Sequence, residues 1–567
     1  MKRSSITKVW LSSCCALPLL GFAQKRPHII LIFTDQQNVN AMSAAGNPFL
    51  YTPNMDALAN DGIRFTNAYC TSPVSGPSRA SIVTGLMARE AGVEWNDNSK
   101  LSEGIHTVGD LLGENGYRTV WAGKWHIPEI YPQRSKHEIK YLHGFELLPF
   151  WDAPNKHWLL GAETDPPLTD AVVSFLDGYD KREKPLFLAV SYHNPHDICM
   201  YPRKVGWETM SDSLLNIRPF GKYKLPEPMG VHPDSLSYLP PLPGNFSKNV
   251  DEPEFIIDKR VKPNPYGDEV QLSSRFSGRE WQAYLNSYYR LTELVDKEIG
   301  EVIEALKRNG MYENSLIIFT SDHGDGMAAH EWAAKLSFYE ESVKVPLIMV
   351  LPEKWQRGGV NSGLVSLVDL VPTFCDYAGV SPKTNFAGMS LRRAIFPTEE
   401  RWRDFVVAEL ADHLKDRTRK GRMIRTGRYK YAIYSSGERN EQLFDLMTDP
   451  GETINLAYSK EYWEILKKHR SLLVKWMNYR YLMDYSPVLL LGAALCWFCA
   501  EGALSRRAAL GEGTAAAALP ALRTVMAAAV AYTAVYRFCT LFAMEPYLQG
   551  MNPSLYYTVS RLVQFWM

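Results

Sequence analysis

Four short apolar segments of the chain each run directly into polar side chains, and this pattern constrains the fold more than any other feature. The segments are residues 28–34, 118–123, 186–192 and 315–321. Short apolar runs that alternate with amphipathic stretches are typical of a buried sheet covered by helices, so we expect an α/β fold. In such sheets ligands bind beyond the carboxyl ends of the strands, where the loops converge. The pattern predicts one site at the ends of four strands.

The residues that follow these segments can bind a metal ion or an anion. They are Asp35 and Gln36, Lys124 and His126, His193 and His196, and Asp322 and His323. Carboxylate and amide oxygens are the hard donors that Ca²⁺ and Mg²⁺ prefer, and an imidazole can join them. Any one of these residues could equally be a solvated loop side chain. Four repeats of the pattern favour a functional site.

The most informative stretch of the chain is residues 75–85, which read Ser-Gly-Pro-Ser-Arg-Ala-Ser-Ile-Val-Thr-Gly. Taken alone, this cluster would begin a helix and Ser75 would be a surface hydroxyl. The stretch matches the signature of the sulfatase family, which is Cys or Ser, any residue, Pro, Ser and Arg, followed by a short apolar helix that ends in Thr-Gly. The chain therefore resembles the sulfatase family.

Further stretches match this family in its order, and they extend the resemblance to about residues 26–460. They are residues 52–59, 123–126, 193–196 and 321–324, Lys335 with residues 339–342 and 345–347, and residues 443–446, 449–450 and 455–457. The resemblance implies an alkaline-phosphatase-like fold, with a large mixed sheet flanked by helices and a smaller C-terminal α+β subdomain. It also implies a sulfuric ester hydrolase in which a maturation enzyme oxidises Ser75 to formylglycine. The hydrated aldehyde, a gem-diol, would be a stronger nucleophile than a serine hydroxyl.

The resemblance also assigns a metal site. A divalent cation, Ca²⁺ with Mg²⁺ as the alternative, would be held by Asp35, Gln36, Ser75, Asp322 and His323. The family more often has Asp where Gln36 stands and often Asn where His323 stands. Because Gln36 removes one negative charge, the choice of ion stays open.

The remaining matches imply catalytic roles. Arg79 would orient the nucleophile, Lys124 and Lys335 would contact the sulfate oxygens, and His126 and His196 would act on the nucleophile and the leaving group. Two further histidines, His193 and His330, match the family less sharply. We expect them behind the site or against the substrate.

The two ends of the chain differ in composition from its body. Residues 1–23 combine a basic start with a short apolar run, which predicts a signal peptide and an exported protein, periplasmic or extracellular. A lipoprotein cleavage box at residues 11–14 is the alternative reading. Residues 481–567 form an alanine-rich apolar tail of unknown role. A marginal membrane hairpin and a foreign fusion both fit this tail, so membrane association stays open.

The body of the chain divides into two parts. We assign residues 24–388 to the sulfatase catalytic domain and residues 389–480 to a C-terminal antiparallel-sheet subdomain. Within the second part, residues 425–434 and 442–446 predict an antiparallel hairpin and residues 461–474 a helix.

The charge balance limits the partners. Lys and Arg together number 62 and so do Asp and Glu, which gives a formal net charge of zero. A nucleic-acid partner is not expected, because such proteins carry a basic surface. Export and a neutral charge favour a sulfated carbohydrate as substrate, for example a glycosaminoglycan fragment.

Two other functions stay open. One is a phosphonate or phosphate diester hydrolase of the same superfamily, some members of which combine the Asp-Gln and Asp-His pairs present here. The other is a non-catalytic protein that binds sulfated glycans, if Ser75 is never oxidised. The joint presence of Lys124, His126, His196 and Lys335 argues against the second.

Overall fold

The structure is a computed structural model in which most of the chain between residues 26 and 477 is described. The described residues are 26–96, 99–128, 139–149, 161–180, 184–201, 238–249, 251–261, 269–352, 358–396, 402–411 and 419–477, with a few positions between 501 and 524. The predicted signal peptide and most of the tail lie outside this set. No helix among the described residues is both long enough and apolar enough to cross a membrane.

The main sheet has nine strands among the described residues, in the order β4-β5-β3-β6-β1-β7-β8-β2-β9. In chain order they are β1 (His28–Asp35), β2 (Ile63–Tyr69), β3 (Arg118–Gly123), β4 (Tyr141–Leu142), β5 (Phe145–Leu147), β6 (Leu186–Pro195), β7 (Ser315–Ser321), β8 (Lys344–Val350) and β9 (Gly359–Ser366). β8 runs antiparallel to β7 and β2, and β4 runs antiparallel to β5. The predicted large mixed sheet is confirmed.

The four apolar segments are the neighbouring strands β3, β6, β1 and β7. β1 pairs in parallel with both β6 and β7, so that Ile30 lies opposite Leu188 on one side and Ile317 on the other. β3 pairs in parallel with the far side of β6. All eight residues of β1 are buried, as expected for a parallel strand covered on both faces. The carboxyl ends of these four strands therefore meet at one edge of the sheet.

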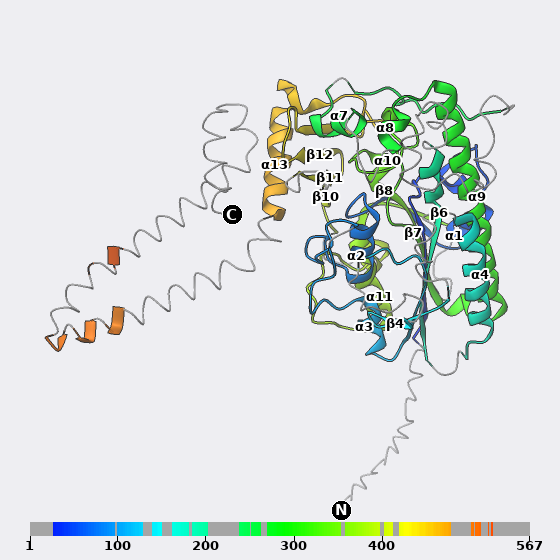
Figure 1. The fold of residues 1–567 in the computed structure, drawn as a ribbon. Helices are drawn as coiled ribbons and strands as arrows, with labels where there is room; N and C mark the ends of the chain where they lie inside the picture. Colours follow the sequence, from blue (N-terminus) through cyan, green and yellow to red (C-terminus); the bar gives the residue numbers. More distant parts are fainter. Residues whose placement is uncertain are drawn as a thin grey trace, which may run out of the picture.

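Helices cover both faces of this sheet (Figure 1). One face packs against α1 (Pro53–Asp61), α4 (Gly161–Asp177) and α9 (Gly278–Arg308), and the other against α2 (Ser75–Thr84), α3 (Val108–Gly113) and α11 (Leu370–Ala378). Successive residues of β1 alternate between the two layers, because Ile30 packs with the first group and Ile29 with the second. Shorter helices are α7 (Glu254–Val261), α8 (Glu269–Ser273), α10 (Glu340–Val343) and α12 (Arg392–Ile395).

The long helix α9 supports the loops at the site. It begins with a capping box, in which the Glu280 backbone N–H donates to Ser277 Oγ (3.3 Å) and the Ser277 N–H donates to the Glu280 carboxylate (2.6 Å). Tyr284 and Tyr288 lie one turn apart on its buried face. Their hydroxyls reach the loops that follow β7 and β1, so the helix fixes both loops from behind.

A second sheet forms the C-terminal subdomain. Its strands β10 (Phe405–Ala411), β11 (Lys420–Thr426), β12 (Tyr429–Tyr434) and β13 (Glu441–Asp445) are antiparallel and lie in sequence order. Helix α13 (Trp463–Met477) packs on one face of this sheet. The predicted α+β subdomain, its β12–β13 hairpin and its helix are confirmed.

One expectation for this subdomain is wrong. Residues 425–434 are not one strand, because a turn at Gly427 and Arg428 separates β11 from β12. Thr426 Oγ1 donates to the carbonyl of Tyr429 across this turn (3.0 Å), which closes a second hairpin. The sequence already held the signal, because glycine inside an apolar run favours a turn.

Candidate active site

Ser75 is the first residue of α2, at the carboxyl edge of the sheet. A short loop leads from the end of β2 to this helix, and all ten residues of the helix are buried. Ser75 Oγ lies 2.9 Å from His323 Nε2, 3.3 Å from Lys335 Nζ and 3.5 Å from Asp35 Oδ1. The positive end of the helix dipole is at this N-terminus, where it favours a bound anion.

Asp35 is the last residue of β1 and Asp322 follows the adjacent strand β7, and Arg79 holds both. Its guanidinium donates to Asp35 Oδ2 (3.0 Å) and to Asp322 Oδ2 (2.8 Å), and all three side chains are fully buried. The Oδ1 atoms of the two carboxylates instead face His323, at 3.8 Å and 3.7 Å from its Nε2. Arg79 therefore aligns the two carboxylates and does not itself bond to Ser75 Oγ within the described residues.

These atoms form a set of donors that fits a divalent cation. The ligand atoms of Asp35, Asp322 and His323 all lie within 4.8 Å of one another. Burial lowers the pKa of His323 to about 4, so its imidazole is neutral at pH 7. Since His323 Nδ1 lies 2.9 Å from the carbonyl oxygen of Gly324, the proton belongs on Nδ1 and Nε2 offers a lone pair. Two carboxylate oxygens and one imidazole nitrogen are suitable ligands for Ca²⁺, Mg²⁺ or a transition metal.

The electrostatics keep Asp35 ionised. Burial alone would raise its pKa, but the charges of Lys124, Arg79 and Lys335 hold the pKa well below its usual range. The nearest of these groups is Lys124, which follows β3 and places Nζ 2.6 Å from Asp35 Oδ2. A permanently charged carboxylate is what a metal ligand requires.

Lys335 brings a second ammonium group to the nucleophile. Its Nζ donates to Gln36 Oε1 (3.0 Å) and lies 3.3 Å from Ser75 Oγ. Lys335 lies in the loop between β7 and α10. The ammonium groups of Lys124 and Lys335 thus lie beside the metal-ligand carboxylates and the hydroxyl, where they can bind the oxygens of an anionic substrate.

Two half-buried imidazoles complete the site. The pKa values of His126 and His196 are well below the usual range, because burial and the neighbouring charge of Lys124 both disfavour the imidazolium. His126 Nδ1 has no hydrogen-bond partner among the described residues. Neutral imidazoles of this kind can accept a proton or, once protonated, pass one to a leaving group.

The geometry of this site is consistent with the protein families whose models match the chain. A family model described as "Sulfatase" matches residues 27–380, and one described as "N-sulphoglucosamine sulphohydrolase, C-terminal" matches residues 328–478. The chain belongs to the sulfatase family. It is a sulfuric ester hydrolase, and the described residues hold a cluster that could bind this family's metal.

Named relatives of this sulfatase act on sulfated sugars. A Delta 4,5-hexuronate-2-O-sulfatase of Bacteroides thetaiotaomicron is 30% identical over 476 residues, which is 80% of this chain and 89% of the relative. An N-acetylglucosamine-6-O-sulfatase of the same organism is 29% identical, over 79% of this chain and 85% of the relative.

Solved structures agree with the fold. A 2-O GAG sulfatase superposes with a TM-score of 0.65 at 27% identity, over 80% of this chain and 93% of that one. A phosphonate monoester hydrolase of Agrobacterium radiobacter superposes with a TM-score of 0.61 at 22% identity, over 79% of this chain and 95% of that one. The second likeness shows the fold alone.

Two of the predicted histidines lie apart from the nucleophile of the sulfatase. His193, near the end of β6, places Nδ1 3.2 Å from Thr164 Oγ1 and 3.5 Å from Asp165 Oδ1. His330 stacks on Tyr339 with their ring centroids 3.9 Å apart, beside the C-terminal subdomain. His330 therefore belongs to the seam between the two parts of the molecule.

Sequence reasoning missed several residues that support the site. Asn96 Oδ1 accepts the Gly76 N–H (2.8 Å), Ser191 Oγ accepts from Arg79 (2.8 Å), and Asp325 Oδ2 accepts from Gln36 Nε2 (2.8 Å). A signal existed for Asp325, an acidic residue in the loop of the predicted ligands Asp322 and His323. No local signal marked Asn96 or Ser191, because their roles depend on tertiary contacts.

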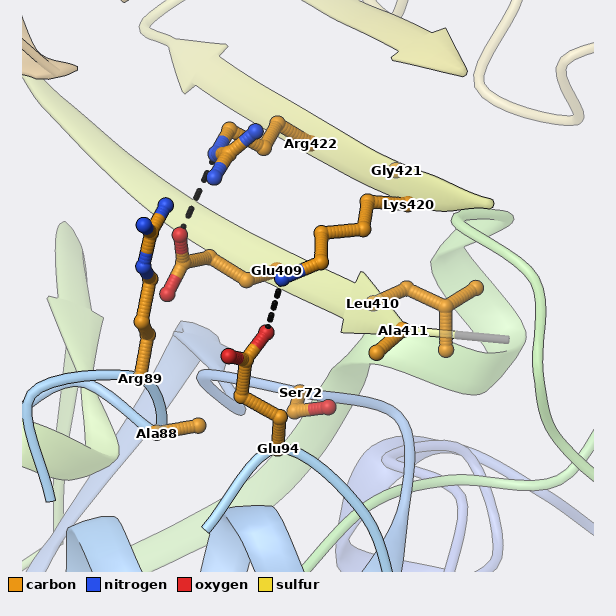
Figure 2. Close-up of a pocket in the computed structure, with 10 residues that line it drawn as sticks. All are labelled: Ser72, Ala88, Arg89, Glu94, Glu409, Leu410, Ala411, Lys420, Gly421 and Arg422. Carbon is orange, nitrogen blue, oxygen red and sulfur yellow. Dashed lines mark hydrogen bonds and ion pairs between the residues drawn. The ribbon is translucent and has the colours of Figure 1, made fainter. Parts of the chain in front are cut away.

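A separate hollow lies at the seam, and Figure 2 shows that paired charged side chains line it. Its lining residues are Ser72, Ala88, Arg89 and Glu94 of the catalytic part, and Glu409, Leu410, Ala411, Lys420, Gly421 and Arg422 of β10 and β11. Lys420 pairs with Glu94 (2.6 Å) and Arg422 with Glu409 (3.2 Å). The Glu409 N–H donates to the carbonyl of Thr71 (2.7 Å), in the loop that leads to Ser75. We therefore assign the hollow a structural role, in which it ties the small sheet to that loop.

Proposed function

We propose that this sulfatase removes sulfate from a sulfated carbohydrate, with Ser75 oxidised to formylglycine and a divalent cation bound beside it. The observation that carries the proposal is the position of Ser75 Oγ, at the N-terminus of a buried helix and against the cluster of Asp35, Asp322 and His323. The two relatives named for hexuronate 2-O-sulfate and N-acetylglucosamine 6-O-sulfate support a glycosaminoglycan fragment as substrate. We also propose that the protein is exported, in agreement with residues 1–23.

Asp35, Asp322, His323 and the Gln36 side-chain oxygen would hold the cation, with Ca²⁺ preferred over Mg²⁺. A bound cation would supply a Lewis acid that stabilises negative charge on the sulfate oxygens. Arg79 binds the Oδ2 atoms of both aspartates, so their other oxygens are available to the cation. Arg79 would thus support the nucleophile through its ligands.

Residues of the chain itself would supply the nucleophile, the stabilising positive charges and the proton transfer. An unmodified serine is a weak nucleophile, and formylglycine supplies a hydrated aldehyde in its place. Lys124 and Lys335 would stabilise negative charge on the sulfate oxygens in a buried setting, where such charges interact strongly. The neutral imidazoles of His126 and His196 would accept the proton of the nucleophile and, once protonated, would pass that proton to the leaving alcohol.

The test is sulfate release by protein made together with a formylglycine-generating maturation enzyme. We expect release from 2-O- or 6-O-sulfated disaccharides, loss of release in Ser75→Ala, and loss after chelation with recovery on addition of Ca²⁺ or Mg²⁺. Sulfate release that persists in Ser75→Ala would contradict the proposed nucleophile. Full activity in the presence of a chelator would contradict the proposed metal requirement.

Phosphonate or phosphodiester hydrolysis is the second candidate function. It is favoured by Gln36 and His323, which stand where the family more often has Asp and Asn. The comparison that decides is kcat/KM on a sulfate monoester against kcat/KM on a phosphate diester, with the same enzyme preparation. A higher value on the diester would replace the sulfatase proposal. Tight binding of a sulfated glycan with no turnover of either ester would identify a binding protein.

A further inference from the structure

The side-chain amide of Gln36 has one orientation that its surroundings allow. Its Nε2 lies 2.8 Å from Asp325 Oδ2, and its Oε1 lies 3.0 Å from Lys335 Nζ. If the amide were reversed, its oxygen would face a carboxylate and its NH₂ group would face an ammonium. Both contacts would be repulsive, so the Asp325 carboxylate and the Lys335 ammonium fix the orientation of the amide.

Asp325 is itself held in place. Tyr284 of α9 donates its hydroxyl proton to the carboxylate, at 2.8 Å and 2.9 Å from the two oxygens, and the Met327 N–H donates to Oδ1 (2.8 Å). Asp325 and Tyr284 are fully buried. Tyr288, one turn along α9, donates to the backbone carbonyl of Gln36 (2.6 Å). Neither the carboxylate nor the Gln36 backbone can turn away without losing buried hydrogen bonds.

We propose that Asp325 is a positioning residue of the metal site, which fixes the Gln36 amide with its oxygen towards Lys335 and Ser75. This inference rests on the proposed function in one respect, the binding of a divalent cation by the cluster of Asp35, Asp322 and His323. An amide nitrogen cannot ligate a cation, so an amide that turns removes one donor from the site. Loss of such a supporting partner typically weakens metal binding about 10-fold to 100-fold.

The decisive experiment is a double-mutant cycle on Gln36 and Asp325, with metal affinity as the readout. In Asp325→Asn the Met327 N–H keeps the new amide oxygen at the Oδ1 position, so the new NH₂ group faces Gln36 and drives its amide to turn. In Gln36→Glu two carboxylates oppose each other. In the double variant, Gln36→Glu with Asp325→Asn, the NH₂ group donates to the new carboxylate and the second carboxylate oxygen faces the site again.

Affinity for Ca²⁺ and Mg²⁺ would be measured from the rise in Tm with metal concentration. We expect Kd to rise about 10-fold to 100-fold in Asp325→Asn and to return to within about 3-fold of the wild type in the double variant. Tyr284→Phe, which keeps Gln36 and Asp325 and removes one donor, should raise Kd several-fold. It also serves as the second variant if Asp325→Asn does not fold.

Asp296→Asn is the matched control. Asp296 is also a buried aspartate that accepts backbone N–H groups, those of Asn54 and Met55, and it holds α1 instead of the site. Its substitution should lower the Tm of the metal-free protein and leave the metal Kd unchanged. Equal effects on Kd in Asp296→Asn and Asp325→Asn would overturn the proposal.

The remaining outcomes separate this inference from the proposed function. Additive effects, with the double variant as weak as both single changes together, would overturn the positioning role even if sulfate release were normal. A wild type that binds neither cation would also overturn it. Coupling in metal binding without hydrolysis of any sulfate ester would leave Asp325 as a positioning residue and reject the proposed function.

Discussion

The molecule has two buried clusters of acidic and histidine side chains that look alike in composition and differ in where their positive charges lie. The first contains Asp35, Asp322 and His323, and the second contains His330, Glu341 and Glu452. In the first, Arg79 pairs with the outer carboxylate oxygens and the inner ones face His323. The inner oxygens of the two aspartates therefore have no ion-pair partner among the described lysine and arginine side chains and are open to a cation.

In the second cluster an ammonium already lies among the carboxylates. Lys430 of β12 places Nζ 2.5 Å from Glu452 Oε1 and 3.0 Å from Glu340 Oε1, and only 1% of its side chain is exposed. Asn245 donates to Glu341 Oε1 (2.9 Å). The cluster thus joins the C-terminal subdomain to the catalytic part as an internal ion network. The types of ligand atom in a cluster therefore do not by themselves make a metal site. The position of the neighbouring positive side chain determines whether a metal ion can bind.

The largest expected effect is at the first cluster. Asp322→Asn keeps the shape of the side chain and an acceptor for Arg79, and it removes a charged ligand. We expect turnover of a sulfated disaccharide to fall by more than about 1,000-fold, together with loss of the Ca²⁺-induced rise in Tm. Steady-state kinetics and thermal unfolding with and without metal would measure both. Near-normal turnover in this variant would place the metal elsewhere.

The next effect concerns Lys335. Loss of a charge that stabilises the transition state typically costs roughly 100-fold to 1,000-fold in kcat, so Lys335→Ala should lose that much with little change in Tm. Lys307→Ala is the control, because Lys307 is a surface residue that pairs with Glu304. It should alter neither quantity. A wild-type kcat/KM in Lys335→Ala would show that this lysine takes no part in the reaction.

The second cluster should respond to substitution in stability and not in chemistry. Lys430→Met removes the buried ammonium that pairs with Glu340 and contacts Glu452, which should lower the free energy of unfolding by about 3–5 kcal/mol. Lys420→Met, at the same seam, breaks a half-exposed pair with Glu94 and should cost no more than about 1 kcal/mol. Urea denaturation would compare them. A normal stability for Lys430→Met, with metal binding lost, would reverse our assignment of the two clusters.

Glu452 should also make the stability depend on pH. Burial raises its pKa from 4.5 to about 8, and Glu340 and Glu341 add to the rise although Lys430 opposes it. Between these values the folded protein holds a proton that the unfolded chain has lost, so this group makes stability fall as pH rises, by at most about 1.4 kcal/mol per pH unit. Urea denaturation from about pH 5 to about pH 8 should show a flatter dependence in Glu452→Gln. An unchanged slope in that variant would assign the dependence to other groups.

The sequence predicted which residues lie together where single strands deliver them. Asp35, Lys124 and Asp322 lie at the ends of buried apolar strands, and the parallel order of those strands brings these ends together. It predicted less where a role depends on contacts between distant segments. Nothing local shows that Arg79 binds two carboxylates, or that Asp325 holds Gln36 against Tyr284. His330 matches the family only loosely, and the structure places it at the seam, stacked on Tyr339.

The central claim is that residue 75 acts as an oxidised nucleophile beside the first cluster. It is tested most directly by the mass of the peptide that contains residue 75, taken from enzymatically active protein purified from its native host. Conversion of serine to formylglycine removes two hydrogens, so we expect a peptide about 2 Da lighter than the encoded sequence. Fully active protein in which residue 75 is entirely unmodified serine would contradict it.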